Sequence, residues 1–190
     1  VALKRVGFAS TELRDQSQSA VMNSVQDFAE KLDQAGEDAV GFFYYSGHGA
    51  SGMLGSARTN YVVPVGVPIS SSRDLIANGV EVQRIIDILS NTKAKALFIV
   101  FDACRVAPPW PNGPNVPTKG WTVVRPGGNR LFVFFASPEG GTTADDGLFA
   151  EALGNELVKP NLSHMEVFDN AAWNANDRRQ LFTFASPSGA

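Results

Sequence analysis

Two stretches of the chain are apolar without interruption, and they restrict the fold more than any other feature. Residues 96–101 read Ala-Leu-Phe-Ile-Val-Phe, and residues 131–136 read Leu-Phe-Val-Phe-Phe-Ala. A strand with one face in water alternates apolar and polar residues, whereas a strand covered on both faces is apolar throughout. The two stretches therefore predict inner strands of a parallel sheet that has helices on both sides.

The remaining apolar patterns supply further strands and the helices of an α/β fold. Short apolar runs predict strands at residues 3–9, 40–45 and 61–65, and a last edge strand at 181–184. Apolar residues at helical spacing predict helices over residues 21–32, 82–89 and 148–157, and a capping box at 163–166 predicts the start of one more. The predicted fold class is α/β, a three-layer α/β/α sandwich with a mostly parallel central sheet.

Size and composition indicate one domain over residues 1–190. The chain is 44% hydrophobic and 18% charged, with a formal net charge of -3 and no basic cluster. We therefore expect neither a nucleic-acid groove nor binding to an anionic membrane surface. No apolar run approaches the ~20 residues that cross a bilayer. The single cysteine cannot form an internal disulfide, so we expect a cytoplasmic protein.

A segment rich in proline separates the two halves of the chain. Residues 107–129 contain six of the eleven prolines. Proline lacks a backbone N–H and breaks helices and inner strands, so this segment is predicted to be a long exposed loop. Loops of more than ~12 residues in a compact domain are usually functional or disordered.

A histidine and the only cysteine follow two of the predicted strands directly. The strand at 40–45 runs into Ser-Gly-His48-Gly49, and the strand at 96–101 runs into Asp102-Ala-Cys104. The carboxyl ends of parallel strands form one edge of a sheet, where ligands bind. Because a free thiol has a pKa of ~8.5, an imidazole that removes its proton makes it a better nucleophile. We predict that His48 and Cys104 form a catalytic dyad, with the amides of Gly49 and Cys104 as an oxyanion hole.

Other interpretations of these residues exist. A lone cysteine after an apolar strand is often a buried small hydrophobic residue, and a lone histidine at a strand end often has a structural hydrogen bond. Their shared position at strand ends favours catalysis. One cysteine and two histidines cannot complete a zinc site, and we expect no metal or other cofactor, although a calcium requirement stays open.

The two motifs resemble the His and Cys motifs of the caspase-like cysteine peptidases, the clan that includes caspases, metacaspases and their bacterial relatives. Residues 134–141 are similar to the strand and specificity loop of the family's small-subunit region, with Ser137, Pro138 and Glu139 in the loop. The resemblance implies a large-subunit-like part at 1–106, a connecting loop at 107–129 and a small-subunit-like part at 130–190.

The chain also departs from the family pattern. Caspases have glutamine where this chain has Asp102 and glycine where it has Val106. In metacaspases, an aspartate at the first position helps to form the S1 pocket and selects Arg or Lys, which implies the same role for Asp102; the alternative is an inward carboxylate that caps local amides. The family's first strand and helix have no counterpart before residues 3–32, so we expect that a segment was removed or that another chain completes the sheet.

We therefore predict a cysteine endopeptidase that cleaves protein or peptide substrates after Arg or Lys through an acyl-enzyme. The 107–129 loop is expected to be a self-processing segment with its cleavage site after Lys119. Two alternatives remain open: a catalytically silent caspase-like scaffold or peptide-binding domain, and a thiol hydrolase of the same fold class that acts on a small molecule.

Overall fold

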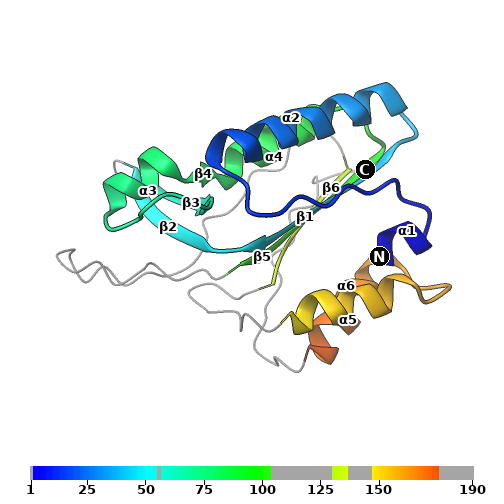
Figure 1. The fold of residues 1–190 in the computed structure, drawn as a ribbon. Coiled ribbons are helices and arrows are strands. Elements are labelled where there is room, and N and C mark those ends of the chain that lie inside the picture. The colour runs from blue at the N-terminus through cyan, green and yellow to red at the C-terminus, as the bar shows by residue number, and fades with distance from the viewer. Residues whose placement is uncertain (1, 55–56, 104–129, 137–146, 176–190) are drawn as a thin grey trace.

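The computed structural model describes residues 2–54, 57–103, 130–136 and 147–175. Six helices and six strands are assigned in these residues (Figure 1). In chain order they are α1 (Ala2–Arg5), α2 (Gln18–Ala35), β1 (Val40–Gly47), β2 (Gly49–Leu54), β3 (Ala57–Val62), α3 (Ser72–Asn78), β4 (Val80–Glu81), α4 (Val82–Ser90), β5 (Ala96–Ala103), β6 (Arg130–Phe135), α5 (Leu148–Leu157) and α6 (His164–Asn174).

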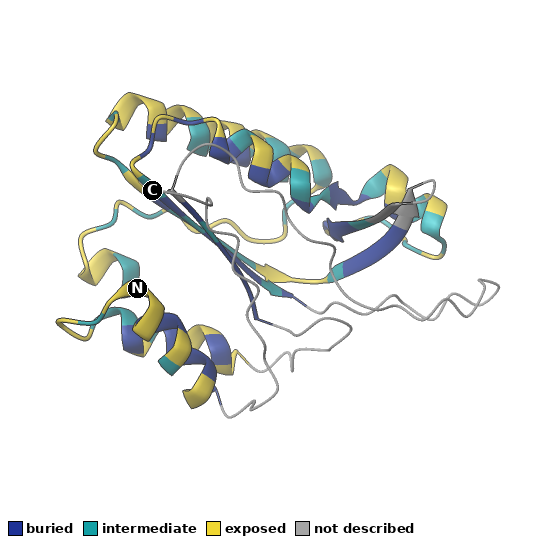
Figure 2. Ribbon diagram, turned by 180° about the vertical axis from the view of Figure 1, so that it is seen from behind, coloured by how far each residue is buried: buried dark blue, intermediate teal, exposed yellow. Residues whose placement is uncertain are grey.

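The main sheet consists of β1, β5 and β6, in that order, and its strands are all parallel. Helices α2 and α4 lie on one face of this sheet, and α5 and α6 lie on the other (Figure 1). In Figure 2 the strands are largely buried, whereas the helices are buried toward the sheet and exposed on the outside. The predicted α/β fold with a parallel sheet between helical layers is confirmed.

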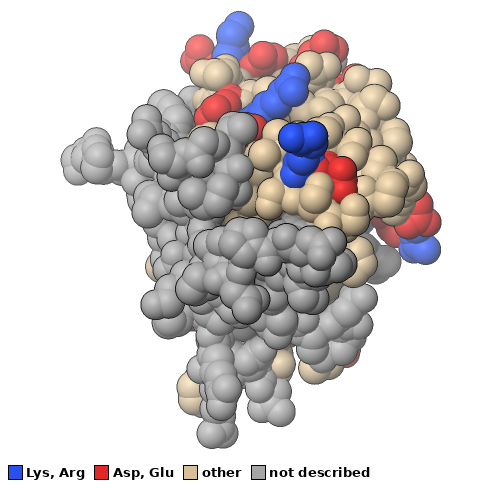
Figure 3. All heavy atoms as spheres, turned by 90° about the vertical axis from the view of Figure 1, so that its left-hand side faces the viewer, with Lys and Arg blue, Asp and Glu red and all other residues tan. Residues whose placement is uncertain are grey.

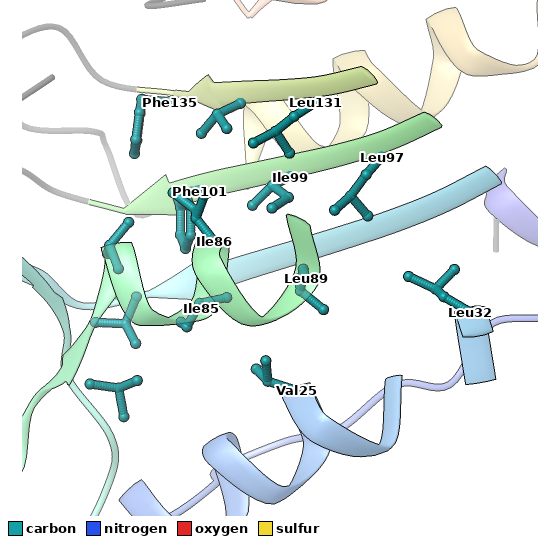
Figure 4. Packing of buried hydrophobic residues seen from close by; sticks show 14 of the residues in the cluster. Val25, Leu32, Ile85, Ile86, Leu89, Leu97, Ile99, Phe101, Leu131 and Phe135 are labelled. Carbon is teal, nitrogen blue, oxygen red and sulfur yellow. The ribbon is translucent and has the colours of Figure 1, made fainter. Parts of the chain in front are cut away.

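The face toward α2 and α4 has an aliphatic core. Every second residue of β5 points to this face, and Leu97, Ile99 and Phe101 there have no exposed surface. Ile86 from α4 packs among them, as Figure 4 shows. A glycine makes the close approach of α2 possible, because a Cβ atom on Gly41 would lie only 3.1 Å from both Cδ atoms of Leu32 on α2, and 2.7 Å from the Leu97 Cδ1 atom on β5. This core holds β1 and β5 under the first helical layer.

The opposite face has an aromatic core. Phe134 of β6 stacks on Phe168 of α6 with 3.4 Å between ring centroids. Beside it, the buried carboxylate of Glu156 binds the Lys159 amine at 2.6 Å and the Asn174 amide at 2.8 Å, which ties α5 to α6. The predicted capping box is confirmed at the start of α6, where the Ser163 side chain accepts from the Glu166 amide.

A second, antiparallel sheet follows the carboxyl end of β1. Its strand order is β2-β3-β4, and the predicted strand at 61–65 corresponds to its middle strand, which ends earlier, at Val62. Pro64 cannot donate a backbone hydrogen bond, so the strand cannot continue through it. The sequence did not predict β2, because a stretch that reads Gly-Ala-Ser-Gly has little strand propensity.

The strand predicted at residues 3–9 is wrong. Residues Ala2–Arg5 form the short helix α1, and the Phe8 amide then donates to the Leu3 carbonyl at 3.0 Å. Gly7 has a φ of +95°, a left-handed conformation that turns the chain out of any extended path. Phe8 packs edge-on against Phe42 of β1 with 6.1 Å between ring centroids. The apolar residues of this run are thus used in a turn and not in a strand.

The described surface carries charged side chains of both signs (Figure 3). Figure 3 shows the side of the molecule that lies at the left in Figure 1, and on its described surface acidic and basic side chains lie beside one another. Among the helices that the structure describes, none combines the length and apolar character needed to cross a membrane. The predicted edge strand at 181–184 lies outside the described residues.

The aliphatic core predicts a large loss of stability for Ile86→Ala. Ile86 has no exposed surface, so its truncation removes buried methylene groups and leaves a cavity. We expect the free energy of unfolding to fall by about 2–5 kcal/mol. Urea unfolding followed by circular dichroism measures it. The matched control is Ile76→Ala, since Ile76 is 37% exposed and should lose less than about 1 kcal/mol. Equal losses for the two variants would contradict the assignment of this core.

Candidate active site

The register of the main sheet brings the two predicted catalytic motifs to one edge. Gly47, the last residue of β1, is the partner of Ala103, the last residue of β5. These two residues directly precede His48 and Cys104 in the chain. Neighbouring strands lie ~4.8 Å apart, so both motifs leave the sheet from adjacent positions. Cys104 itself lies outside the described residues, and so do Lys119, Ser137, Pro138 and Glu139.

His48 occupies the single position between β1 and β2, and it is exposed. Its main chain is fixed by two hydrogen bonds to its carbonyl oxygen. The Val63 amide donates at 2.8 Å, and the Tyr45 hydroxyl donates at 2.9 Å. Burial raises the pKa of Tyr45 to about 12, so this hydroxyl keeps its proton at neutral pH. The imidazole is therefore open to solvent while its backbone is held in place.

Gly47 gives the Tyr45 hydroxyl the space that it needs. A Cβ atom on Gly47 would lie 2.9 Å from the Tyr45 hydroxyl oxygen and 3.2 Å from the adjoining ring carbon. The φ angle of Gly47 is +157°, which residues with side chains rarely adopt. Gly49, the other glycine beside His48, begins β2 and pairs with Val62. A glycine is thus needed at position 47 because a side chain there would collide with the Tyr45 hydroxyl, a contact that the sequence alone did not reveal.

Asp102 lies one residue before the end of β5, in register with Ser46 of β1. Its Oδ2 atom accepts a hydrogen bond of 2.6 Å from the Tyr44 hydroxyl. Burial raises the pKa of Tyr44 well above its ordinary value, and the charge of Asp102 raises it further, so Tyr44 stays a donor. The structure identifies a tyrosine beside each motif.

The second histidine lies away from this edge. His164 begins α6, and its ring centroid is 4.4 Å from that of Phe132 and 5.8 Å from that of Phe98. These phenylalanines are the third residues of β6 and β5, toward the amino ends of the strands. His48 is therefore the histidine at the carboxyl edge. The described residues contain no group of three or more His, Cys, Asp or Glu that could hold a metal ion.

A comparison with known protein families covers most of the chain. A family model described as the caspase domain matches residues 1–179. The comparison with curated proteins gives no match.

The contact between Gly47 and Tyr45 predicts energetic coupling between them. Gly47→Ala should destabilise the protein by about 1–3 kcal/mol, because the new methyl group forces the tyrosine hydroxyl away. In a Tyr45→Phe background the same change should cost at least about 0.5 kcal/mol less, because the nearest blocking atom is absent. Thermal or urea unfolding of the four proteins measures this difference.

Gly36→Ala is the matched control for this cycle. Gly36 also has a positive φ, of +86°, but a Cβ atom there would have no neighbour within 4 Å. Its substitution should cost the same free energy with and without the Tyr45 hydroxyl. A coupling as large for Gly36 as for Gly47 would show that the contact is not the cause.

Proposed function

Since the chain belongs to the caspase-domain family, we propose that it is a cysteine endopeptidase with His48 and Cys104 as its catalytic dyad. The observation that carries the proposal is the register pair of Gly47 and Ala103, from which both residues follow directly. Two groups that leave adjacent parallel strands at the same edge start within reach of a shared substrate. The proposal includes one catalytic domain over residues 1–190.

The proposed reaction passes through an acyl-enzyme. The Cys104 sulfur attacks the carbonyl carbon of the scissile bond while His48 accepts the thiol proton. The amides of Gly49 and Cys104 stabilise the negative oxygen of the tetrahedral intermediate. His48 then protonates the leaving amine, and a water molecule, deprotonated by His48, hydrolyses the thioester. The exposure of His48 and the two hydrogen bonds to its carbonyl support this role, because the ring can meet substrate without its backbone moving.

We further propose that Asp102 selects Arg or Lys at the residue before the cleaved bond. It is the carboxylate nearest to Cys104 on β5, and it is only partly buried. A carboxylate forms charge-assisted hydrogen bonds with a guanidinium or ammonium group. The Tyr44 hydroxyl, which donates to this carboxylate, is a neutral group and adds no positive charge beside it. Ser137, Pro138 and Glu139 are proposed as the specificity loop.

A binding function without catalysis is the second candidate. Among the described residues β1 pairs with β5 alone, so its other edge has no strand partner there. Unpaired strand edges can bind an extended peptide by adding a strand to the sheet. A segment outside the given sequence or another chain would be the partner in that case. Turnover measurements separate this candidate from the peptidase.

The dyad predicts that turnover depends on two residues and not on the second histidine. Cys104→Ala should abolish hydrolysis of fluorogenic peptides, and His48→Ala should lower kcat by at least ~10²-fold. His164→Ala is the matched control and should retain wild-type kcat, because this residue lies at the other end of the sheet. Peptides that end in Arg, Lys or Asp before the fluorophore report the specificity. A wild-type protein that binds these peptides and hydrolyses none would favour the scaffold.

The proposed basic specificity also predicts self-cleavage after Lys119. The 107–129 segment contains Lys119 followed by glycine, and Arg125 followed by Pro126. A proline on the leaving side hinders binding and cleavage, so the bond after Lys119 is the better substrate. Incubation of the wild type should yield a fragment that begins at Gly120, whereas Cys104→Ala and Lys119→Gln should stay intact at this bond. An intact segment in a demonstrably active enzyme would refute the prediction.

A further inference from the structure

We infer that Tyr44 is a positioning residue for substrate specificity, which holds the Asp102 carboxylate in the orientation that receives an arginine side chain. The inference rests on the proposed function, because it assumes that Asp102 contacts the basic residue of the substrate. It assigns to Tyr44 no direct contact with substrate.

The geometry of the sheet brings these two side chains together. Tyr44 is the register partner of Val100. Asp102 lies two residues after Val100 on β5, and residues two apart on a strand point to the same face. Asp102 is therefore diagonally adjacent to Tyr44, on the face that α5 and α6 cover. The phenol reaches along the sheet toward the carboxyl end of β5, where its hydroxyl donates to Asp102 Oδ2 at 2.6 Å. This length is typical of a hydrogen bond to an ionised carboxylate.

The bond restrains the rotation of the carboxylate. Rotation of an aspartate carboxylate about its terminal bond is broad and weakly restrained when no partner holds it. A carboxylate has about four lone-pair sites, so one bond from Tyr44 is compatible with further donors. A guanidinium binds a carboxylate through two parallel hydrogen bonds and needs the correct plane, whereas an ammonium group acts as a point charge. Tyr44 is therefore expected to matter more for Arg than for Lys.

The neighbouring tyrosine provides an internal comparison. Tyr45 points to the opposite face of the same strand, and its hydroxyl donates to the His48 carbonyl at 2.9 Å. Both tyrosines are partly buried, and each loses one hydroxyl donor in a substitution to phenylalanine. Tyr45→Phe should affect the reaction at His48, and Tyr44→Phe should affect recognition of the basic residue.

The test measures kcat and KM on two peptides that differ only in Arg or Lys before the cleaved bond. Tyr44→Phe should raise the KM of the Arg peptide by up to roughly 10- to 150-fold, the range that corresponds to one lost hydrogen bond to a charged group, with kcat changed less than about threefold. The preference for Arg over Lys should fall. Asp102→Asn should remove the preference, and Tyr44→Phe combined with Asp102→Asn should be no worse than Asp102→Asn alone. Tyr45→Phe should lower kcat and keep the preference.

Three outcomes distinguish a failure of the inference from a failure of the proposed function. If Tyr44→Phe lowers kcat equally for both peptides and keeps the Arg preference, its role is structural and the inference is overturned, while the peptidase stands. If Asp102→Asn keeps the preference, the proposed specificity and the inference are both overturned. If the wild type has no turnover that depends on Cys104, the proposed function itself fails.

A folding control and a second variant keep the test decisive. Cys104 is the only cysteine, so a wild-type rate of alkylation by iodoacetamide, together with a wild-type thermal unfolding transition, shows that a variant retains a native site. If Tyr44→Phe does not fold, Asp102→Glu replaces it, because it keeps the charge and moves the carboxylate one methylene away from its partner. The Arg preference should fall in that variant as well, and an unchanged preference would contradict the inference.

Discussion

The parallel pairing of β1 with β5 is the interaction on which the rest of the structure depends. The register is continuous from Val40 and Ala96 to Gly47 and Ala103. It lines up the carboxyl ends of two strands whose next residues are His48 and Cys104. Because side chains alternate between faces, the same register determines which side chains meet the aliphatic core and which meet the aromatic one.

The two helical layers hold this register from opposite sides. A slip by one residue would turn Leu97 and Ile99 toward α5 and α6, and it would separate Tyr44 from Asp102. The first layer supplies aliphatic contacts, with Gly41 allowing α2 to approach, and the second supplies stacked aromatic rings and the buried Glu156 carboxylate. The pKa of Glu156 lies below its ordinary value, chiefly because the Lys159 amine binds it. The alignment at the carboxyl edge is thus a consequence of packing on both faces.

The sequence predicted those features that depend on local patterns. Uninterrupted apolar runs identified β5 and β6, helical spacing identified α2 and α4, and the Ser163 motif identified the start of α6. Features that depend on tertiary contacts were missed. Strand β2 is rich in glycine and forms because it pairs with β3, and the apolar residues around Leu3 enter a helix and a turn because Gly7 adopts a positive φ. Spacing also cannot show which partner a tyrosine hydroxyl finds, so the contacts of Tyr44 and Tyr45 required the structure.

Alternation along one strand explains how adjacent residues can serve different parts of one site. Tyr45 points toward the aliphatic face and binds the His48 backbone, while Tyr44 points toward the aromatic face and binds Asp102. Since the two hydroxyl groups are on opposite sides of the sheet, one can change without moving the other. An exposed histidine has few packing contacts, so the two hydrogen bonds to its carbonyl oxygen are what hold its backbone in place. Gly47, which has no side chain between Tyr45 and that backbone, is the residue that makes this arrangement possible.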